Sequence, residues 1–396
     1  MDYSKLFSGR LPAEVSMPPG FNAQTKYVFS VTYADPDTLA AQGLCAALSR
    51  AISDEGRDLA MYPPPQGHIG MRQLIAEDLE RKRGISTSIE SVFLSAGANG
   101  AIQCIIDAFI DPGDIVLVEE FSYLGTLNML LSRRAEVVHI PTDADGMDTD
   151  ALEDKIRGLV RSQRRPKMIY TISVYQNPTG VTLSLERRKR MLEIARKYQV
   201  PILENESYAD FRIDGPPLPP AITGMDDGDM VMYVSAYTKL LGCGLRLGFG
   251  VVPEPVRKGL ARLRFGGAPS HMASMAVHEY MKQDGDRHIQ AVAESLKAKR
   301  GAMLGALTEH FPPTCWSSRP HGGMMVWVRL PEGADTWNAL EKAVERGVKY
   351  NPGPVFRAQR DCRNYLRLTY SHNTPDEIRE GVALLSEVFR KEGLFG

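Results

Sequence analysis

The sequence has little net charge and no hydrophobic run long enough to span a membrane. Its 396 residues include 47 lysines and arginines against 48 aspartates and glutamates, a formal net charge of −1. With no basic face and no acidic tail, nucleic acids and membrane surfaces are not expected as partners. The polar, mixed start of the chain predicts neither a signal peptide nor a transmembrane helix.

Cysteine and histidine are few, and neither forms a recognisable pattern. The five cysteines are widely spaced, and none forms a C-x-x-C pair, which is typical of reduced thiols in a cytoplasmic protein. The eight histidines show no metal-ligand spacing, so the sequence predicts no structural metal. The length of the chain predicts two or three domains with ample core.

The most informative stretch runs from Met230 to Val252, MVMYVSAYTKLLGCGLRLGFGVV. Apolar runs lie on both sides of a single lysine, Lys239, and predict strands that are buried on both faces. A buried lysine without a partner is costly, so such a residue is usually neutral, paired or covalently used. A neutral amine is the nucleophile that Schiff-base formation requires. The alternative is a lysine at a strand end that extends into water.

Predicted strands and helices alternate from Ser91 onward. The strands are SVFLSAG, DIVLVEE, EVVHIPT, KMIYTISVY, PILENESY and VMYVSAY. This alternation predicts an α/β fold with a mainly parallel sheet and helices on both of its faces. Capping-box spacing predicts helix starts at Asp150 with Glu153 and at Thr374 with Glu377.

Three regions are expected along the chain. Residues 1–55 form an N-terminal arm, with a short strand KYVFSVTYA, and contribute to a small domain. Residues 56–285 form the large domain, and residues 286–396 form a smaller α+β domain with a helix over 336–346. The boundary between the last two is placed in KQDGDRH, residues 282–288.

Candidate ligand-binding residues lie at the ends of the predicted strands. Ligands bind beyond the carboxyl ends of the strands in an open parallel sheet. The candidates there are Ser95 to Asn99, Tyr123, Asn177, the LENESY segment and Lys239. LSAGANGA places a glycine turn before a helix N-terminus, where free N–H groups favour a phosphate, although such residues also serve simply as helix caps.

Two arginines interrupt apolar runs. Arg246, in GLRLG, needs an anionic partner. Arg367, in YLRLTYS, has a planar fork that suits a carboxylate, and an internal salt bridge is the alternative. Tyr33, Tyr175 and Tyr237 are candidates for a side-chain pocket, although tyrosines near strand ends often only pack.

These motifs together resemble a known family. YPPPQGHIGMR, LSAGANGAI with DPGDIVLVEEFSY, QNPTG, LENESY, SAYTK, GLRLGFG and YLRLTYS are similar, in this order, to the motifs of class I/II aminotransferases. These are fold type I pyridoxal-phosphate enzymes, and the most similar branch includes 2-aminoadipate and kynurenine aminotransferases. The resemblance implies a mainly parallel large domain and a smaller α+β domain. It is weaker at VTYADPD, where the family usually has a glycine-rich substrate segment.

The resemblance also implies roles for individual residues. Lys239 would hold pyridoxal 5'-phosphate as an internal aldimine and later move the proton at Cα. The other implied cofactor contacts are stacking by Tyr123, hydrogen bonds from Asn177 and Tyr208 to the ring oxygen, Asn205 at the pyridine nitrogen, and phosphate contacts from Ala98, Asn99, Thr238, Arg246 and Tyr62 of a neighbouring subunit. Arg367 would bind the substrate α-carboxylate, with Asn177 and Tyr33 also beside the substrate. The role of Tyr62 implies a homodimer with shared active sites.

Two positions depart from the family pattern. Ala236 stands where the family has a serine or threonine, so one phosphate contact is expected to be missing. Asn205 stands where the family has an aspartate, whose charge keeps the pyridine nitrogen protonated and makes the ring an electron sink. A neutral amide supplies no such charge. Strand alternation points Glu204 and Glu206 away from the face of Asn205, unless a bulge intervenes.

The resemblance implies an enzyme that acts on an α-amino acid through an external aldimine and Cα deprotonation. Its default reaction is amino transfer to a 2-oxo acid. Asn205 and VTYADPD leave an alternative open: elimination, replacement or carbon–carbon bond formation at Cβ or Cγ, as in the aminocyclopropane-carboxylate synthase relatives, in specialised biosynthesis. A non-enzymatic regulator with an aminotransferase-like domain is a third hypothesis, but the chain lacks the basic DNA-binding region that it needs.

Overall fold

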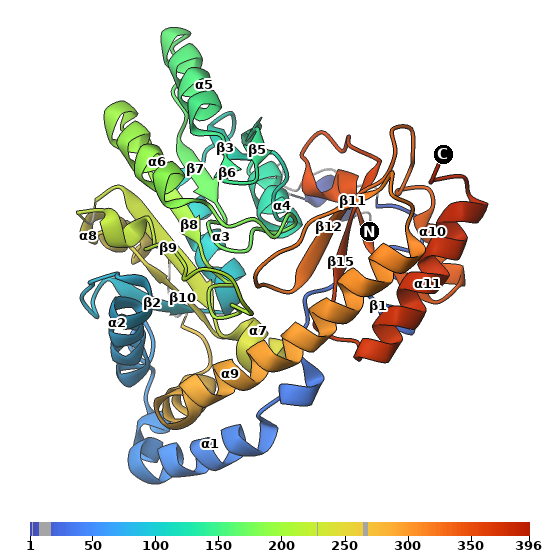
Figure 1. Cartoon of the computed structure of the whole chain (residues 1–396). Coiled ribbons are helices and arrows are strands. Elements are labelled where there is room, and N and C mark those ends of the chain that lie inside the picture. Colours follow the sequence, from blue (N-terminus) through green and yellow to red (C-terminus); the bar gives the residue numbers. More distant parts are fainter. Residues whose placement is uncertain (2, 8–16, 228, 264–267) are drawn as a thin grey trace.

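The computed structural model describes the chain except for residues 2, 8–16, 228 and 264–267. Part of the expected N-terminal arm therefore lies outside the described residues. Figure 1 shows a large sheet with its helices on the left and a smaller sheet on the right. The long helix α9 (His271–His310) runs from the large sheet to the small one.

The large sheet has seven strands, and its order along the sheet differs from the order along the chain. The strands are, from edge to edge, β2 (Val92–Ser95), β10 (Gly248–Val251), β9 (Val231–Ala236), β8 (Ile202–Asn205), β7 (Met168–Thr171), β3 (Ile115–Glu119) and β4 (Glu136–Ile140). β10 is antiparallel to both of its neighbours, and the other pairs are parallel. The predicted mainly parallel sheet is confirmed.

Helices cover both faces of this sheet. They are α3 (Gly97–Phe109), α4 (Leu124–Ser132), α5 (Thr149–Arg161) and α6 (Leu185–Tyr198). In β3, Val116 and Val118 pack in the core cluster that includes α3 and α4, whereas Ile115 and Leu117 pack in the cluster that includes α5 and α6. Alternate residues of one strand therefore enter two different cores, which explains why the strand sequences are apolar throughout.

The smaller sheet is antiparallel and is built from the C-terminal part of the chain. Its strands are β11 (Trp316–Ser317), β12 (Met325–Arg329), β15 (Tyr365–Thr369) and β14 (Asn351–Pro352). β1 (Tyr27–Val28) pairs with β13 (Val348–Lys349), so the N-terminal segment joins this part of the molecule. The strand predicted over KYVFSVTYA is only the two residues of β1.

The remaining elements are shorter or lie outside the two sheets. They are α1 (Ala41–Glu55), α2 (Ile69–Arg83), α7 (Thr238–Leu241), α8 (Glu254–Leu260), α10 (Leu340–Glu345), α11 (Pro375–Lys391), β5 (Thr142–Asp143), β6 (Gly146–Met147), and the 3-10 turns η1 (Tyr3–Leu6), η2 (Pro36–Thr38), η3 (Gly56–Ala60), η4 (Thr223–Met225), η5 (Cys243–Leu245) and η6 (Gly353–Phe356). None of the described helices is both long and apolar enough to cross a membrane.

Three sequence predictions about helices can be compared with the structure. The capping box of α11, Thr374 with Glu377, is confirmed. The predicted start of α5 lies two residues too late, because the side chain of Asp148 caps this helix by accepting hydrogen bonds from the backbone N–H groups of the residues two and three positions later. The helix expected over 336–346 is the shorter α10.

The predicted boundary over residues 282–288 falls inside α9, which runs through it without a break. The division of the chain into three regions therefore stays a prediction, with one helix shared between two of them.

Gly248 lies where β10 closely approaches the backbone at the start of α3. A Cβ on Gly248 would lie 2.4 Å from the carbonyl carbon of Gly97 and 2.6 Å from the nitrogen of Ala98. Backbone cannot move aside as a flexible side chain can, so Gly248→Ala should destabilise the protein by about 1–3 kcal/mol or more and lower its melting temperature. Gly158→Ala, in α5 where a Cβ meets open space, is the control and should leave stability unchanged or slightly higher. Equal melting temperatures for the two variants would contradict the close approach.

Candidate active site

A cavity of about 120 Å³ lies beyond the carboxyl ends of the large sheet. Twelve residues that the sequence singled out, by themselves or within a candidate segment, line it: Gly97, Ala98, Asn99, Tyr123, Asn177, Asn205, Ser207, Tyr208, Ala236, Thr238, Lys239 and Arg246. They come from the carboxyl ends of five parallel strands and, for Arg246, from the turn before the antiparallel β10, all of which lie at one edge of the sheet. Thr32 and Ile172 also line the cavity, and sequence reasoning missed them as candidates. Their proximity to Tyr33 and Asn177 in the sequence was the available signal.

Lys239 lies on α7, directly after β9, and is half-buried at the cavity wall. Among the residues that the structure describes, its ammonium has no ion-pair partner within reach. Burial lowers the pKa of Lys239, the nearby Cys243 opposes this shift, and the positive charges of Arg367 and Arg246 add to it. A lysine with a lowered pKa is more often a free amine at neutral pH, which is the form that attacks an aldehyde or accepts a proton.

The N-terminus of α3 forms an anion cradle at one end of the cavity. Its N-cap, Ala96, provides no side-chain hydrogen bond to the first turn, so this turn keeps free N–H donors. A Cβ on Gly97, which has a φ of +76°, would meet Arg246 Nη2 and Thr238 Oγ1, each at 3.1 Å. A helix N-terminus, a guanidinium and a hydroxyl thus converge on one point, which fits a phosphate group.

Arg246 reaches this point from a turn. It follows η5, has a φ of +49°, and its Nη2 donates to Ala96 O at 2.9 Å. The sequence suggests an arginine inside an apolar run. The structure shows instead an exposed turn residue whose side chain lies along the start of α3.

Arg367 is a buried cation on β15, with only 4% of its surface exposed. Its Nη1 donates to Asn177 Oδ1 at 2.9 Å and its Nη2 donates to Ser30 O, while its Nε has no partner. The guanidinium lies 5.1 Å from the ring centre of Phe356. Burial lowers the pKa of Arg367 to about 10, so it stays charged at neutral pH.

No carboxylate among the described residues pairs with Arg367, so the internal salt bridge considered from the sequence is wrong. A buried guanidinium without a counter-ion is stabilised by an anionic ligand, and its fork matches a carboxylate. Asn177 connects it to the cavity, because this residue both accepts from Arg367 and lines the cavity wall.

Two tyrosines occupy the places that their sequence positions implied. The hydroxyl of Tyr208 lies 3.5 Å from Asn177 Nδ2 and 3.4 Å from Thr32 Oγ1, and burial raises its pKa. Asn99 Nδ2 donates to the hydroxyl of Tyr123 at 3.3 Å. The two phenols therefore lie on the cavity wall with neutral hydrogen-bonding partners.

Asn205 is buried, and both ends of its amide are engaged. Its Nδ2 donates to the Tyr170 hydroxyl at 2.9 Å, and its Oδ1 accepts from the backbone N–H and the hydroxyl of Ser207 at 3.0 and 2.6 Å. Glu204 and Glu206 lie on the opposite face, as strand alternation predicted. Their carboxylates bind Arg188 there, and Glu206 also binds Arg83. Neither carboxylate can replace the missing charge at Asn205.

Several candidates lie outside the cavity. Tyr62 is fully exposed between η3 and α2, and Tyr33 is 40% exposed, with its ring against His372. Tyr175 and Tyr237 do not line this cavity and are buried by packing, which is the alternative that the sequence left open.

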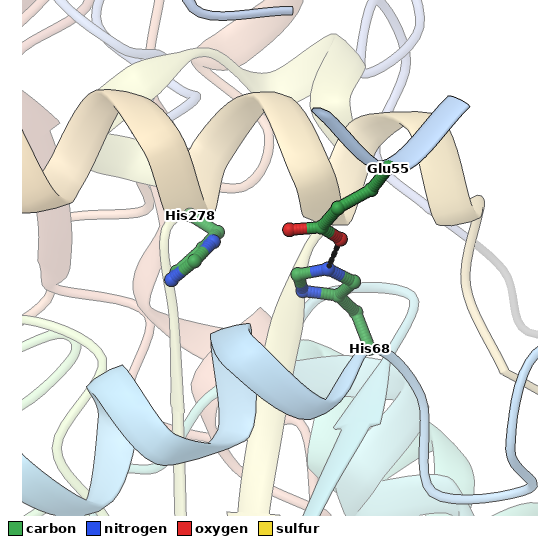
Figure 2. Close-up of side chains that lie close together, drawn as sticks. All are labelled: Glu55, His68 and His278. Carbon is green, nitrogen blue, oxygen red and sulfur yellow. Dashed lines mark hydrogen bonds and ion pairs between the residues drawn. The ribbon is translucent and has the colours of Figure 1, made fainter. Parts of the chain in front are cut away.

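One cluster of possible metal ligands exists among the described residues: Glu55, His68 and His278 (Figure 2). The backbone N–H of Met71 donates to His68 Nδ1 at 3.0 Å, so His68 Nε2 carries the ring proton and donates it to Glu55 at 2.7 Å. A metal ion at Nε2 would force the ring proton onto Nδ1, which could then no longer accept the hydrogen bond from Met71 that caps the helix. Metal-binding histidines usually donate a hydrogen bond through their second nitrogen, whereas Nδ1 of His68 accepts one. The hydrogen bond between His68 and Glu55 therefore links the start of α2 to the end of α1. The absence of a structural metal stays a prediction.

Glu119 is a buried carboxyl behind the cavity wall. Its Oε1 accepts from Thr171 Oγ1 at 2.7 Å and from the backbone N–H of Ile172 at 2.6 Å, and Ile172 lines the cavity. Burial raises the pKa of Glu119 to about 7, and the hydrogen bonds oppose this shift only in part. The side chain thus anchors the backbone next to the site.

The chain is similar to known proteins over nearly its whole length. Residues 29–385 match the family model described as aminotransferase class I and II. Aromatic-amino-acid aminotransferase 1 of Thermococcus litoralis is 34% identical over 361 residues, which cover 90% of this chain and 86% of the relative.

Two solved structures have the same fold. The multiple substrate aminotransferase from Thermococcus profundus is 30% identical, with a TM-score of 0.91 and 99% of each chain covered. An α-aminoadipate aminotransferase from Thermus thermophilus, complexed with N-(5'-phosphopyridoxyl)-L-leucine, is 27% identical, with a TM-score of 0.89 and 99% of each chain covered.

Glu119→Gln tests the buried carboxyl through the pH dependence of stability. The folded-state pKa of about 7 lies above the ordinary value of 4.5, so the folded protein binds the proton more tightly than the unfolded chain. Wild-type stability should therefore fall as pH rises from about 4.5 through 7, while Glu119→Gln removes this contribution. The variant should gain up to about 3 kcal/mol relative to wild type between pH 5 and pH 8, measured by denaturant unfolding. Glu294→Gln, at an exposed position of α9, should show no such gain, and an equal gain in both would contradict the assignment.

Proposed function

The chain belongs to the class I and II aminotransferases, and from this membership we propose that it transfers the amino group of an α-amino acid to a 2-oxo acid, with pyridoxal 5'-phosphate as cofactor. The observation that carries the proposal is the convergence of Lys239, the anion cradle of α3 and the unpaired Arg367 around one cavity. The Thermus relative, complexed with a phosphopyridoxyl amino acid, supports the choice of cofactor.

The cavity residues fit this cofactor. Bound pyridoxal phosphate supplies an aldehyde that captures amines covalently and a ring that withdraws electrons from the substrate Cα. The backbone N–H groups of Ala98 and Asn99 would hold the phosphate together with Thr238 and Arg246. The remaining proposed contacts are stacking by Tyr123, hydrogen bonds from Asn177 and Tyr208, and Asn205 near the ring nitrogen.

The reaction itself depends on two cations with different roles. Arg367 binds the α-carboxylate of the substrate, with Asn177 and Tyr33 beside it, and so orients the bond that must break at Cα. Lys239 then takes the proton from Cα and returns it. Its lowered pKa keeps a fraction of the amine unprotonated at neutral pH, as a general base requires.

The proposal includes a cytoplasmic homodimer. Tyr62 is fully exposed on this chain, which supports a role at the phosphate of a neighbouring subunit rather than its own. The five cysteines all have free thiols, in keeping with a reducing compartment.

Asn205 favours a second candidate function, chemistry at Cβ or Cγ of the amino acid. Its amide is fixed by Tyr170 and Ser207, so the cavity offers no negative charge to the ring nitrogen. A less electron-withdrawing ring slows amino transfer and leaves room for elimination, replacement or carbon–carbon bond formation.

Lys239→Ala tests the proposed function. The purified wild-type protein should show the absorbance of a covalently bound cofactor, and a panel of amino acids should convert this band to that of pyridoxamine phosphate with release of a 2-oxo acid. Lys239→Ala should lose the band and at least about a thousandfold in turnover, whereas Lys297→Ala, at an exposed position of α9, should retain both. A cofactor that returns unchanged while the amino acid side chain is altered would instead support the second function.

Asn205→Asp tests the missing charge. One carboxylate oxygen can keep the two hydrogen bonds from Ser207, and the other can accept from Tyr170, so the fold should be retained. The added charge should favour a protonated ring nitrogen and speed Cα deprotonation by about tenfold or more, measured as the rate of the first half-reaction in a stopped-flow instrument. An unchanged or slower rate would show that Asn205 is already suited to the reaction of this enzyme.

A further inference from the structure

Lys299 is a buried lysine of α9 that lies outside the cavity. Only 2% of it is exposed, and its Nζ lies 2.6 Å from Asp35 Oδ1 and 3.0 Å from Asp37 Oδ2. Asp35 is also buried and accepts a hydrogen bond from Ser295 of the same helix. Such a buried ion pair adds little net stability because both charges lose their hydration, but it strongly fixes the position of the groups that it joins.

The two aspartates end the segment of residues 29–37, which follows β1 and has no regular strand structure after Val28. The carbonyl groups of this segment accept hydrogen bonds from residues of β15 and from Ser371, just after it. The donors and acceptors are Thr369 N to Phe29 O at 2.9 Å, Arg367 Nη2 to Ser30 O, Thr369 Oγ1 to Val31 O at 3.0 Å, and Ser371 Oγ to Tyr33 O at 2.7 Å. Lys299 Nζ also lies 3.4 Å from Ser371 O, so one ammonium contacts both the segment of residues 29–37 and the chain just after β15.

The segment reaches the active site at two points. Thr32 lines the cavity, and its Oγ1 lies 3.4 Å from the Tyr208 hydroxyl. The carbonyl of Ser30 accepts from Arg367, whose other terminal nitrogen donates to Asn177. A shift of the segment would therefore move the group that orients the arginine fork and the hydroxyl next to Tyr208.

We propose that Lys299 is a positioning residue for the substrate side of the cavity. By binding Asp35 and Asp37 it fixes the segment of residues 29–37, and through Ser30 and Thr32 this segment sets the orientation of Arg367 and the cavity wall. The inference rests on the proposed function in one respect, that Arg367 receives the substrate carboxylate. Lys299 contacts none of the residues proposed to hold the cofactor phosphate, so its loss should weaken substrate binding while the cofactor stays bound.

The test compares Lys299→Met with Lys297→Met, the same change at an exposed position of the same helix. Lys299→Met should raise KM for the amino acid about tenfold while kcat changes by less than about threefold and the content of bound cofactor stays the same. Hydrogen exchange of the amides in residues 29–37 should become at least about tenfold faster, because the segment opens more often. Lys297→Met should change none of these quantities.

A second variant covers the case in which the unpaired carboxylate prevents folding. Lys299→Met combined with Asp35→Asn removes the buried charge as well as its partner, and it should fold while retaining the raised KM and the faster exchange. Lys299→Arg should restore KM in part because it keeps a positive charge at this position.

Several outcomes would overturn the inference. One is a lower melting temperature in Lys299→Met and in the double variant with KM and segment exchange unchanged, since that describes stability alone. Another is an equal rise of KM in Lys297→Met. If wild type transferred no amino group at all, the proposed function would fail, and hydrogen exchange would still decide whether Lys299 fixes the segment.

Discussion

The site depends above all on the direction of the strands in the large sheet. Because β2, β9, β8, β7 and β3 all run the same way, their carboxyl ends meet at one edge. Apolar side chains from helices fill most of both faces of the sheet, so most polar side chains of the strands lie where the strands end. A cavity with chemistry at its walls follows from this topology, and each strand contributes only a few residues to it.

Charge within the cavity region is strongly one-sided. Lys239, Arg246 and Arg367 converge, and no carboxylate lies among the residues that line the cavity. The buried glutamates of β8 face away from it and are paired with Arg188 and Arg83 on the other side of the sheet. Burial lowers the pKa of Lys239, and the positive charges of Arg367 and Arg246 add to this shift. The two arginines are left to be neutralised by anions from outside. A ligand with a phosphate and a substrate with a carboxylate provide two such anions.

Most of the fold and most of the cavity were predictable because they depend on local sequence. Apolar runs marked the strands, and residues directly after these runs, such as Asn177 and Lys239, reached the cavity as predicted. The features that the sequence did not predict depend on contacts between segments that are distant in the chain. The Glu55–His68 pair joins two helices, and the carbonyl groups of residues 29–33 are held by β15 and its neighbours. No spacing rule within one segment reveals such contacts. The N-cap of α5 was mispredicted for a different reason, since the sequence offers two aspartates there, Asp148 and Asp150.

Two sequence features, the VTYADPD segment and Asn205, favoured chemistry at the side chain of the substrate, and the structure gives them unequal weight. The aspartates of VTYADPD bind Lys299 away from the cavity, so they account for the position of this segment and not for a different reaction. Only Thr32 of this motif enters the cavity, and it presents a neutral hydroxyl. Asn205, in contrast, lines the cavity itself, and its uncharged amide is held by Tyr170 and Ser207. The choice between amino transfer and chemistry at the side chain therefore depends on a single position, where one atom separates an amide from a carboxylate.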